Sequence, residues 1–240
     1  LPGEAVARLE GRHRAGGGNA LRAAVLGAND GLVSNASLVM GVAGAELSGQ
    51  AILITGLAGL MAGSLSMALG EWLSVQSARE LFEHQIGIER EELLAAPEEE
   101  AEELALIYQA KGLDPARARE LGQRLVQDHD AALDTLAREE LGIDPEELGG
   151  SAWVAAITSF LLFAVGAIIP VLAYFFVAGT TALIISVVLS VIGLFVIGAA
   201  ITVITGRSAL RSGLRQVLFG VAAATITFGV GRLFGTTLGG

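Results

Sequence analysis

The sequence predicts an all-α integral membrane protein with five transmembrane helices and an acidic three-helix domain between the second and third. Hydrophobic residues make up 52% of the 240 residues and charged residues 17%, which is below the roughly 25% typical of soluble domains. Several apolar stretches reach the ~20 residues that a helix needs to cross a bilayer. The acidic residues are concentrated, since residues 80–148 contain 20 of the 25 carboxylates.

The two membrane regions are expected at residues 20–79 and 149–240, after a basic, glycine-rich tail at residues 1–19. Within the tail, the Gly16-Gly17-Gly18 run predicts a flexible joint. Gly27 and Gly31, and likewise Gly59 and Gly63, have the spacing that lets helix backbones pack closely in lipid. The five expected spans lie at 20–45, 51–77, 151–177, 181–205 and 213–234. Pro170 interrupts the third of them.

The acidic domain, residues 80–148, is expected to begin as a continuation of the second span, which has no stop signal before residue 95. Pro97 then predicts a break and a new helix over 98–110, with glutamates in its first turn, where the helix dipole favours negative charge. Asp114 and Pro115 supply a cap and an N1 proline for a third helix over 116–141.

The positions of lysine and arginine predict the orientation. If the spans are numbered in order, the amino-terminal tail, the acidic domain and the loop with Arg207 and Arg211 lie on one side of the membrane. The turn at 46–50 and the connector at 178–180, on the other side, carry no lysine or arginine. The positive-inside rule therefore predicts a cytoplasmic amino terminus and acidic domain and an outer carboxyl terminus.

Two carboxylates within the apolar stretches suggest an ion pathway. Asp30 lies in the first span and Glu71 in the second, one turn after Met67. An ionisable residue at a helix centre costs at least ~2.5–3.5 kcal/mol in lipid, so one that persists usually lines a cavity or pathway. Two simpler interpretations stay open: Glu71 snorkels to the interface, and Met67 packs a helix crossing.

Glutamates at helical spacing in the acidic domain suggest a metal site. The sequence contains no cysteine, so oxygen, imidazole or thioether ligands would have to hold any metal. Glu89 with Glu92, and Glu100 with Glu103, are i, i+3 pairs that share a helix face, and Glu140 can approach them if the helices form a bundle. The alternative is that these glutamates form ordinary solvated faces. A ferritin-type di-iron centre is disfavoured because neither His84 nor His129 has a glutamate three residues before it.

Two stretches, Gly27-Ala28-Asn29-Asp30-Gly31-Leu32-Val33-Ser34 and Ser66-Met67-Ala68-Leu69-Gly70-Glu71-Trp72-Leu73-Ser74-Val75, resemble the signatures of the vacuolar iron transporter family. The resemblance runs from about Asn19 to the end of the chain. It implies a homodimer that exports Fe²⁺, and often Mn²⁺, from the cytosol in exchange for protons through a pore on the dimer axis. Some bacterial relatives carry a ferritin-like domain ahead of the transporter, and the start at Leu1 is consistent with such a domain having been cut away.

The resemblance also assigns roles to individual residues. Asp30 and Met67 match the pore-lining ligands of the family, and Glu71 falls in the same motif. The methionines that assist the cytosolic metal site in the plant relative are replaced here by Leu136 and Ala137. The cytosolic metal-binding glutamates of the family are matched by Glu89, Glu92, Glu100, Glu103 and Glu140.

The sequence thus favours a proton-coupled Fe²⁺/Mn²⁺ transporter, not an enzyme, in a bacterial inner membrane. Its expected partners are a second copy of the chain, the lipid bilayer and divalent metal ions, with no nucleic acid. No tightly bound cofactor is expected, and Fe²⁺, Mn²⁺, Co²⁺ or Zn²⁺ would be substrate and ligand. Two alternatives are a membrane-anchored metal sensor or buffer without transport, and an acidic docking module without a metal role.

Overall fold

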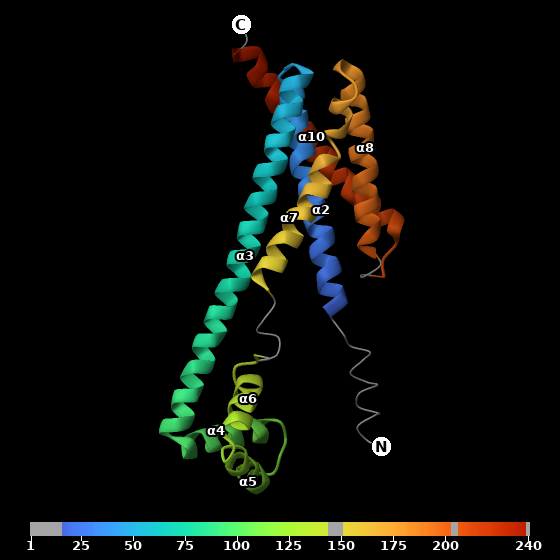
Figure 1. Ribbon diagram of the computed structural model, residues 1–240. Helices are drawn as coiled ribbons and strands as arrows, with labels where there is room; N and C mark the ends of the chain where they lie inside the picture. The colour runs from blue at the N-terminus through green and yellow to red at the C-terminus, as the bar shows by residue number, and fades with distance from the viewer. Residues whose placement is uncertain (1–15, 144–150, 203–205, 239–240) are drawn as a thin grey trace. The chain divides into compact units, whose positions relative to one another are not determined.

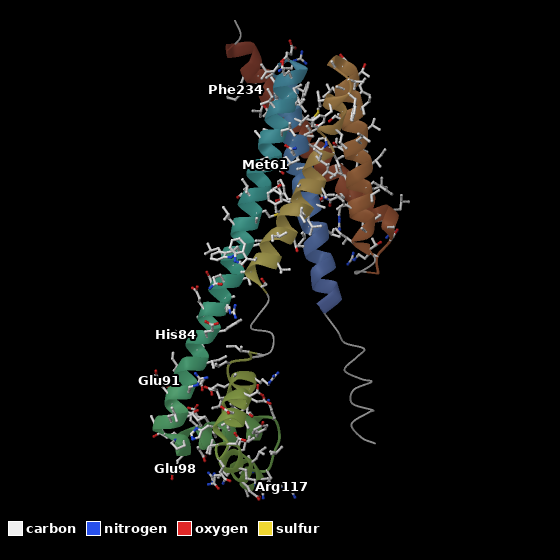
Figure 2. All side chains as sticks on the ribbon, in the orientation of Figure 1. Met61, His84, Glu91, Glu98, Arg117 and Phe234 are labelled. Atoms are coloured by element: carbon white, nitrogen blue, oxygen red, sulfur yellow. The ribbon has the colours of Figure 1, made fainter. Side chains whose placement is uncertain are left out.

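The computed structural model describes residues 16–143, 151–202 and 206–238, and their regular structure is entirely helical (Figure 1). The chain divides into two compact units, residues 1–71 with 156–240 and residues 72–155. Figure 2 shows carbon-rich side chains over the first unit and many carboxylates over the second. The helices are α2 (Gly16–Gly44), α3 (Gly49–Ala95), α4 (Pro97–Ala110), α5 (Pro115–Leu125), α6 (His129–Glu139), α7 (Ala152–Ile168), the 3₁₀ helix η1 (Leu172–Phe175), α8 (Gly179–Ala200) and α10 (Ala209–Leu238).

Three helices of the described residues are long and apolar enough to cross a membrane. They are α3, α8 and residues Ala209–Gly235 of α10. α2 has 29 residues but carries Asp30 in its middle, and α7 is apolar with 17 residues. α2 packs against both α8 and α10, and these two helices also contact each other. Such apolar helices identify an integral membrane protein.

Glycines allow the helices of the first unit to approach closely, as their spacing predicts. A Cβ on Gly31 of α2 would collide with the carbonyl oxygen of Phe163 on α7, and one on Gly166 of α7 would collide with that of Ala28. A Cβ on Gly63 of α3 would collide with the ring of Phe163. Without a hydrophobic driving force in lipid, such close packing is a main source of helix association.

The segment expected as the third span is shorter as a helix than predicted. α7 ends at Ile168, and η1 follows Pro170 instead of a continued α-helix. The proline has no backbone N–H and restricts the residue before it, which explains the end of the helix. Pro170 is buried, and its carbonyl oxygen accepts a hydrogen bond from the Ser186 hydroxyl of α8 at 2.5 Å. A polar contact between helices thus satisfies an acceptor that the break leaves free.

The second unit combines the end of α3 with α4, α5 and α6. One uninterrupted helix of 47 residues carries the chain into this unit, as predicted. Its core contains Leu93 of α3, Leu104 of α4 and Leu136 of α6, each at most 1% exposed. α4 begins with Pro97 at its first turn, and the side chain of Asp114 accepts the Ala116 N–H at the start of α5, also as predicted.

Two local predictions are wrong. The expected helix over 116–141 is two helices, α5 and α6, because the side chain of Asp128 accepts the backbone N–H groups of Asp130 and Ala131 and so caps a new helix. The Gly16-Gly17-Gly18 run, expected as a flexible joint, lies within α2. Extending an existing helix costs far less than nucleating one, and no proline stops α2 there.

Candidate metal centre

Three glutamates from different helices meet in the second unit. Glu89 lies on α3, Glu100 in the first turn of α4, and Glu140 at the cap that follows α6. One carboxylate oxygen of each lies within 4.8 Å of those of the other two. Two oxygens on opposite sides of an ion at ~2.1 Å are ~4.2 Å apart, so this spacing suits a single divalent cation. Among the histidine, aspartate and glutamate side chains of the described residues, this is the only group of three or more that lie this close together.

Burial and mutual repulsion disfavour the ionised form of these glutamates when no cation is bound. Glu89 is 6% exposed and Glu100 5% exposed. Burial, followed by the charges of neighbouring glutamates, raises the pKa of each from 4.5 to about 7. The same two causes raise the pKa of Glu140. At Glu100 they outweigh the dipole of α4, whose amino terminus favours negative charge. A divalent cation would remove the repulsion and favour the ionised forms.

Glu92 and Glu103 complete the set of five glutamates predicted from the sequence. Both are exposed, and their charges contribute to the raised pKa values of the central three. Glu100 differs from them, because its Oε2 is buried and has no hydrogen-bond partner among the described residues. The arrangement therefore has two buried carboxylates, Glu89 and Glu100, with the exposed Glu140 beside them and two more charges nearby at the surface.

Apolar packing and one ion pair position the cluster. The buried Leu136 packs in the core of the unit, and Ala137 is also fully buried. Neither offers a soft ligand, so the donors here are carboxylate oxygens, which hard and borderline cations prefer. Lys111, which follows α4, forms an ion pair with Glu139. This pair links the end of α4 to the end of α6, next to Glu140.

A second group of predicted site residues lines a cavity of about 330 Å³ in the first unit. Asp30 and Ser34 of α2, Ser66 and Met67 of α3, and Phe163 of α7 contribute to its wall. Asp30 is exposed. The Ser34 hydroxyl donates a hydrogen bond to the backbone oxygen of Asp30, not to its carboxylate, at 2.6 Å. The structure thus brings the predicted pore residues Asp30 and Met67 to one cavity.

Two of the simpler interpretations retain support. Met67 packs against the apolar group of Leu60, Phe163 and Ala167 as well as lining the cavity. Glu71 is half-buried on α3 and is not among the residues that line the cavity. The role of Glu71 as a pathway residue therefore stays a prediction.

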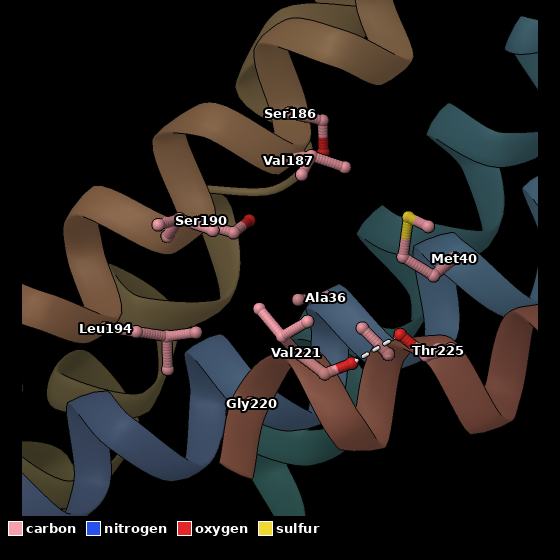
Figure 3. Close-up of a pocket in the computed structure, with 11 residues that line it drawn as sticks. Ala36, Met40, Ser186, Val187, Ser190, Leu194, Gly220, Val221 and Thr225 are labelled. Carbon is pink, nitrogen blue, oxygen red and sulfur yellow. Dashed lines mark hydrogen bonds between the residues drawn. The ribbon is translucent and has the colours of Figure 1, made fainter. Parts of the chain in front are cut away.

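A cavity of about 120 Å³ between α2, α8 and α10 has a different chemistry (Figure 3). The hydroxyl of Ser186 donates to the Pro170 carbonyl at 2.5 Å, and that of Thr225 donates to the Val221 carbonyl at 2.8 Å. No carboxylate or amide side chain is among the described residues that line it. It is therefore a poor site for a cation.

Sequence reasoning missed two asparagines on α2. The amide of Asn35 is 2% exposed and lines the same cavity as Asp30. Asn29 accepts a hydrogen bond from Gln216 of α10, which ties the helix beside Asp30 to its neighbour. The available signal was the rarity of polar side chains in an apolar stretch, since each must find a partner or a function in lipid.

The sequence matches the VIT family over residues 21–232, nearly the whole chain. The chain belongs to the VIT family. Vacuolar iron transporter 1 of Arabidopsis thaliana is 33% identical over 215 residues, which cover 88% of this chain and 84% of that protein. A vacuolar iron transporter of Acanthamoeba castellanii is 38% identical, over 89% of this chain and 78% of the relative. Vacuolar iron transporter homolog 1 of rice is 36% identical, over 90% and 74%.

The residues that match the VIT family include both groups of predicted site residues, since they contain the cavity of α2, α3 and α7 as well as the whole acidic unit. The family resemblance inferred from the two signature stretches is therefore confirmed. The described residues supply oxygen donors at the glutamate cluster and at the Asp30 cavity, with one thioether at the latter.

Proposed function

We propose that this protein is a proton-coupled transporter that exports divalent metal, Fe²⁺ or Mn²⁺, from the cytosol. The observation that carries the proposal is the meeting of Glu89, Glu100 and Glu140, whose oxygens lie within 4.8 Å of one another. Two buried carboxylates with a third beside them are unfavourable unless protons or a cation neutralise them. A site that exchanges protons for a divalent cation near neutral pH is what coupled transport requires.

In this proposal, α2, α3, α7, α8 and α10 are the five transmembrane helices, and the amino terminus and acidic unit are cytoplasmic. The glutamates collect the ion, and Asp30 with Met67 passes it through the membrane. Protonation of Asp30 or Glu71 resets the cycle. Carboxylate and thioether donors together suit a cation of intermediate softness such as Fe²⁺, and Co²⁺ or Zn²⁺ are further candidates.

We infer that two copies of the chain form the pore. Asp30 is exposed in the single chain, and a carboxylate facing lipid costs at least ~2.5–3.5 kcal/mol. A second copy that covers Asp30 and encloses water around it would remove this cost. The family resemblance, which implies a pore on a dimer axis, favours the same arrangement.

Flux in proteoliposomes tests the proposal. Asp30→Ala is expected to abolish Fe²⁺ and Mn²⁺ flux while leaving the dimer intact, as judged by size-exclusion chromatography with light scattering. Near-normal flux in this variant would refute the pathway through Asp30. If purified protein binds Fe²⁺ but no pH gradient drives flux, the protein is a membrane-anchored metal buffer instead.

A further inference from the structure

One buried polar atom in the first unit lacks a partner. Asn35 is 2% exposed, and its Nδ2 donates to the carbonyl oxygens of Gly56 on α3, at 3.1 Å, and Ala167 on α7, at 2.5 Å. Because a carbonyl oxygen only accepts hydrogen bonds, these two contacts fix which end of the amide is nitrogen. Oδ1 therefore points elsewhere, and none of the described residues donates a hydrogen bond to it.

This oxygen lies at the cavity that contains Asp30 and Met67. Asn35 and Gly59 both line that cavity. A Cβ on Gly59 would lie 2.8 Å from Oδ1, which is closer than unbonded atoms normally approach. The glycine therefore makes room for the oxygen on the side of α3, where a methyl group would crowd it, although the oxygen itself is buried.

We propose that Oδ1 of Asn35 is a ligand for the transported divalent cation within the membrane, together with Asp30 and Met67. This inference rests on the proposed function. An amide oxygen is a hard, neutral donor that divalent cations accept readily. A buried acceptor without a donor calls for an explanation, and ion binding supplies one. A neutral ligand also limits the attraction, so that the ion can leave as well as enter.

The amide nitrogen has a separate, structural role, since it joins α2 to α3 and α7. Two substitutions separate the roles of the two amide atoms. Asn35→Leu and Asn35→Asp both remove the donor to Gly56 and Ala167, but only aspartate keeps an oxygen at the cavity. The measurements are the KM of Mn²⁺ flux into proteoliposomes and the midpoint of thermal unfolding.

If Oδ1 is a ligand, Asn35→Leu raises the KM for Mn²⁺ about tenfold or more, the scale of losing a supporting group at a metal site. Asn35→Asp is expected to keep the KM within about threefold of the wild type, although both variants lose thermal stability because they lack the same donor. Equal increases of KM in the two variants would show that only the nitrogen matters and would overturn the proposal.

A second pair of variants leaves the amide in place. Gly59→Ala crowds both Oδ1, at 2.8 Å from the added Cβ, and the side chain of Leu38, whereas Gly70→Ala, on the same helix, has no atom within 4 Å of the added Cβ. A raised KM in Gly59→Ala alone supports the ligand role, and an unchanged KM contradicts it. Absence of Mn²⁺ flux in the wild type would overturn the proposed function and this inference with it. Normal wild-type flux that Asp30→Ala abolishes, with no effect of Asn35→Leu on KM, would overturn only the inference.

Discussion

The affinity of the glutamate cluster for Mn²⁺ is expected to rise steeply between pH 6 and pH 8. Glu89 and Glu100 each have a pKa of about 7 because they are buried among other carboxylates. A metal ligand must be deprotonated, and with independent titration both are ionised in ~1% of molecules at pH 6 and ~80% at pH 8. The structure therefore predicts an affinity about 100-fold higher at pH 8. The raised pKa of Glu140 acts in the same direction.

Isothermal titration of the full chain in detergent with Mn²⁺ at the two pH values measures this effect. The double variant Glu89→Gln, Glu100→Gln should lose both the tight binding and its pH dependence. Glu120→Gln is a matched control, because Glu120 is exposed and pairs with Arg124 on α5. With the ordinary pKa of 4.5, both carboxylates would be over ~90% ionised at pH 6. A wild-type change of less than about twofold would therefore refute the assignment.

The free energy of unfolding of the metal-free protein should fall as the pH rises, whereas the affinity for Mn²⁺ rises. Between pH 4.5 and about pH 7 the folded state holds protons on Glu89 and Glu100 that the unfolded state has released. The free energy of unfolding therefore falls as the pH rises through this window. Saturating Mn²⁺ should restore the thermal midpoint at the upper end, because the cation binds the folded state.

Two further predictions concern packing in each unit. Gly231→Ala on α10 should destabilise the first unit, because its Cβ would collide with the carbonyl oxygen of Gly41. Gly229→Ala, two residues earlier, meets no atom within 4 Å and should be neutral or stabilising by up to ~1 kcal/mol; equal thermal midpoints for the two variants would contradict this packing. Leu104→Ala should lower the free energy of unfolding of the second unit by about 2–5 kcal/mol through loss of core volume. Leu106→Ala, at a side chain 56% exposed, should cost less than about 1 kcal/mol in the same denaturation assay.

The helices were predictable where local chemistry decides them. Pro97 and Asp114 carry their own start signals, and α3 continues because nothing stops it. The break at Asp128 was missed because the apolar spacing of the following residues fits one long helix equally well. The cap bonds that divide α5 from α6 depend on a side-chain conformation that periodicity does not reveal.

The candidate sites were predictable as sets of residues but not as geometries. Helical spacing pairs Glu89 with Glu92, and Glu100 with Glu103. Only the packing of three helices shows that Glu89 and Glu100 are buried and lie beside the exposed Glu140, whereas Glu92 and Glu103 are exposed and lie outside this group of three. Asn35 escaped attention because nothing in its sequence context separates a fully hydrogen-bonded structural amide from one that lines a cavity and whose oxygen has no hydrogen-bond partner among the described residues.

The most direct test of the account is metal uptake into proteoliposomes under an imposed pH gradient, comparing Fe²⁺, Mn²⁺, Co²⁺ and Zn²⁺. With an acidic lumen, Fe²⁺ and Mn²⁺ are expected to accumulate inside while protons leave in exchange, and Asp30→Ala is expected to stop both movements. Metal binding without uptake, or uptake that ignores the direction of the pH gradient, would contradict the claim that this protein exchanges protons for divalent metal.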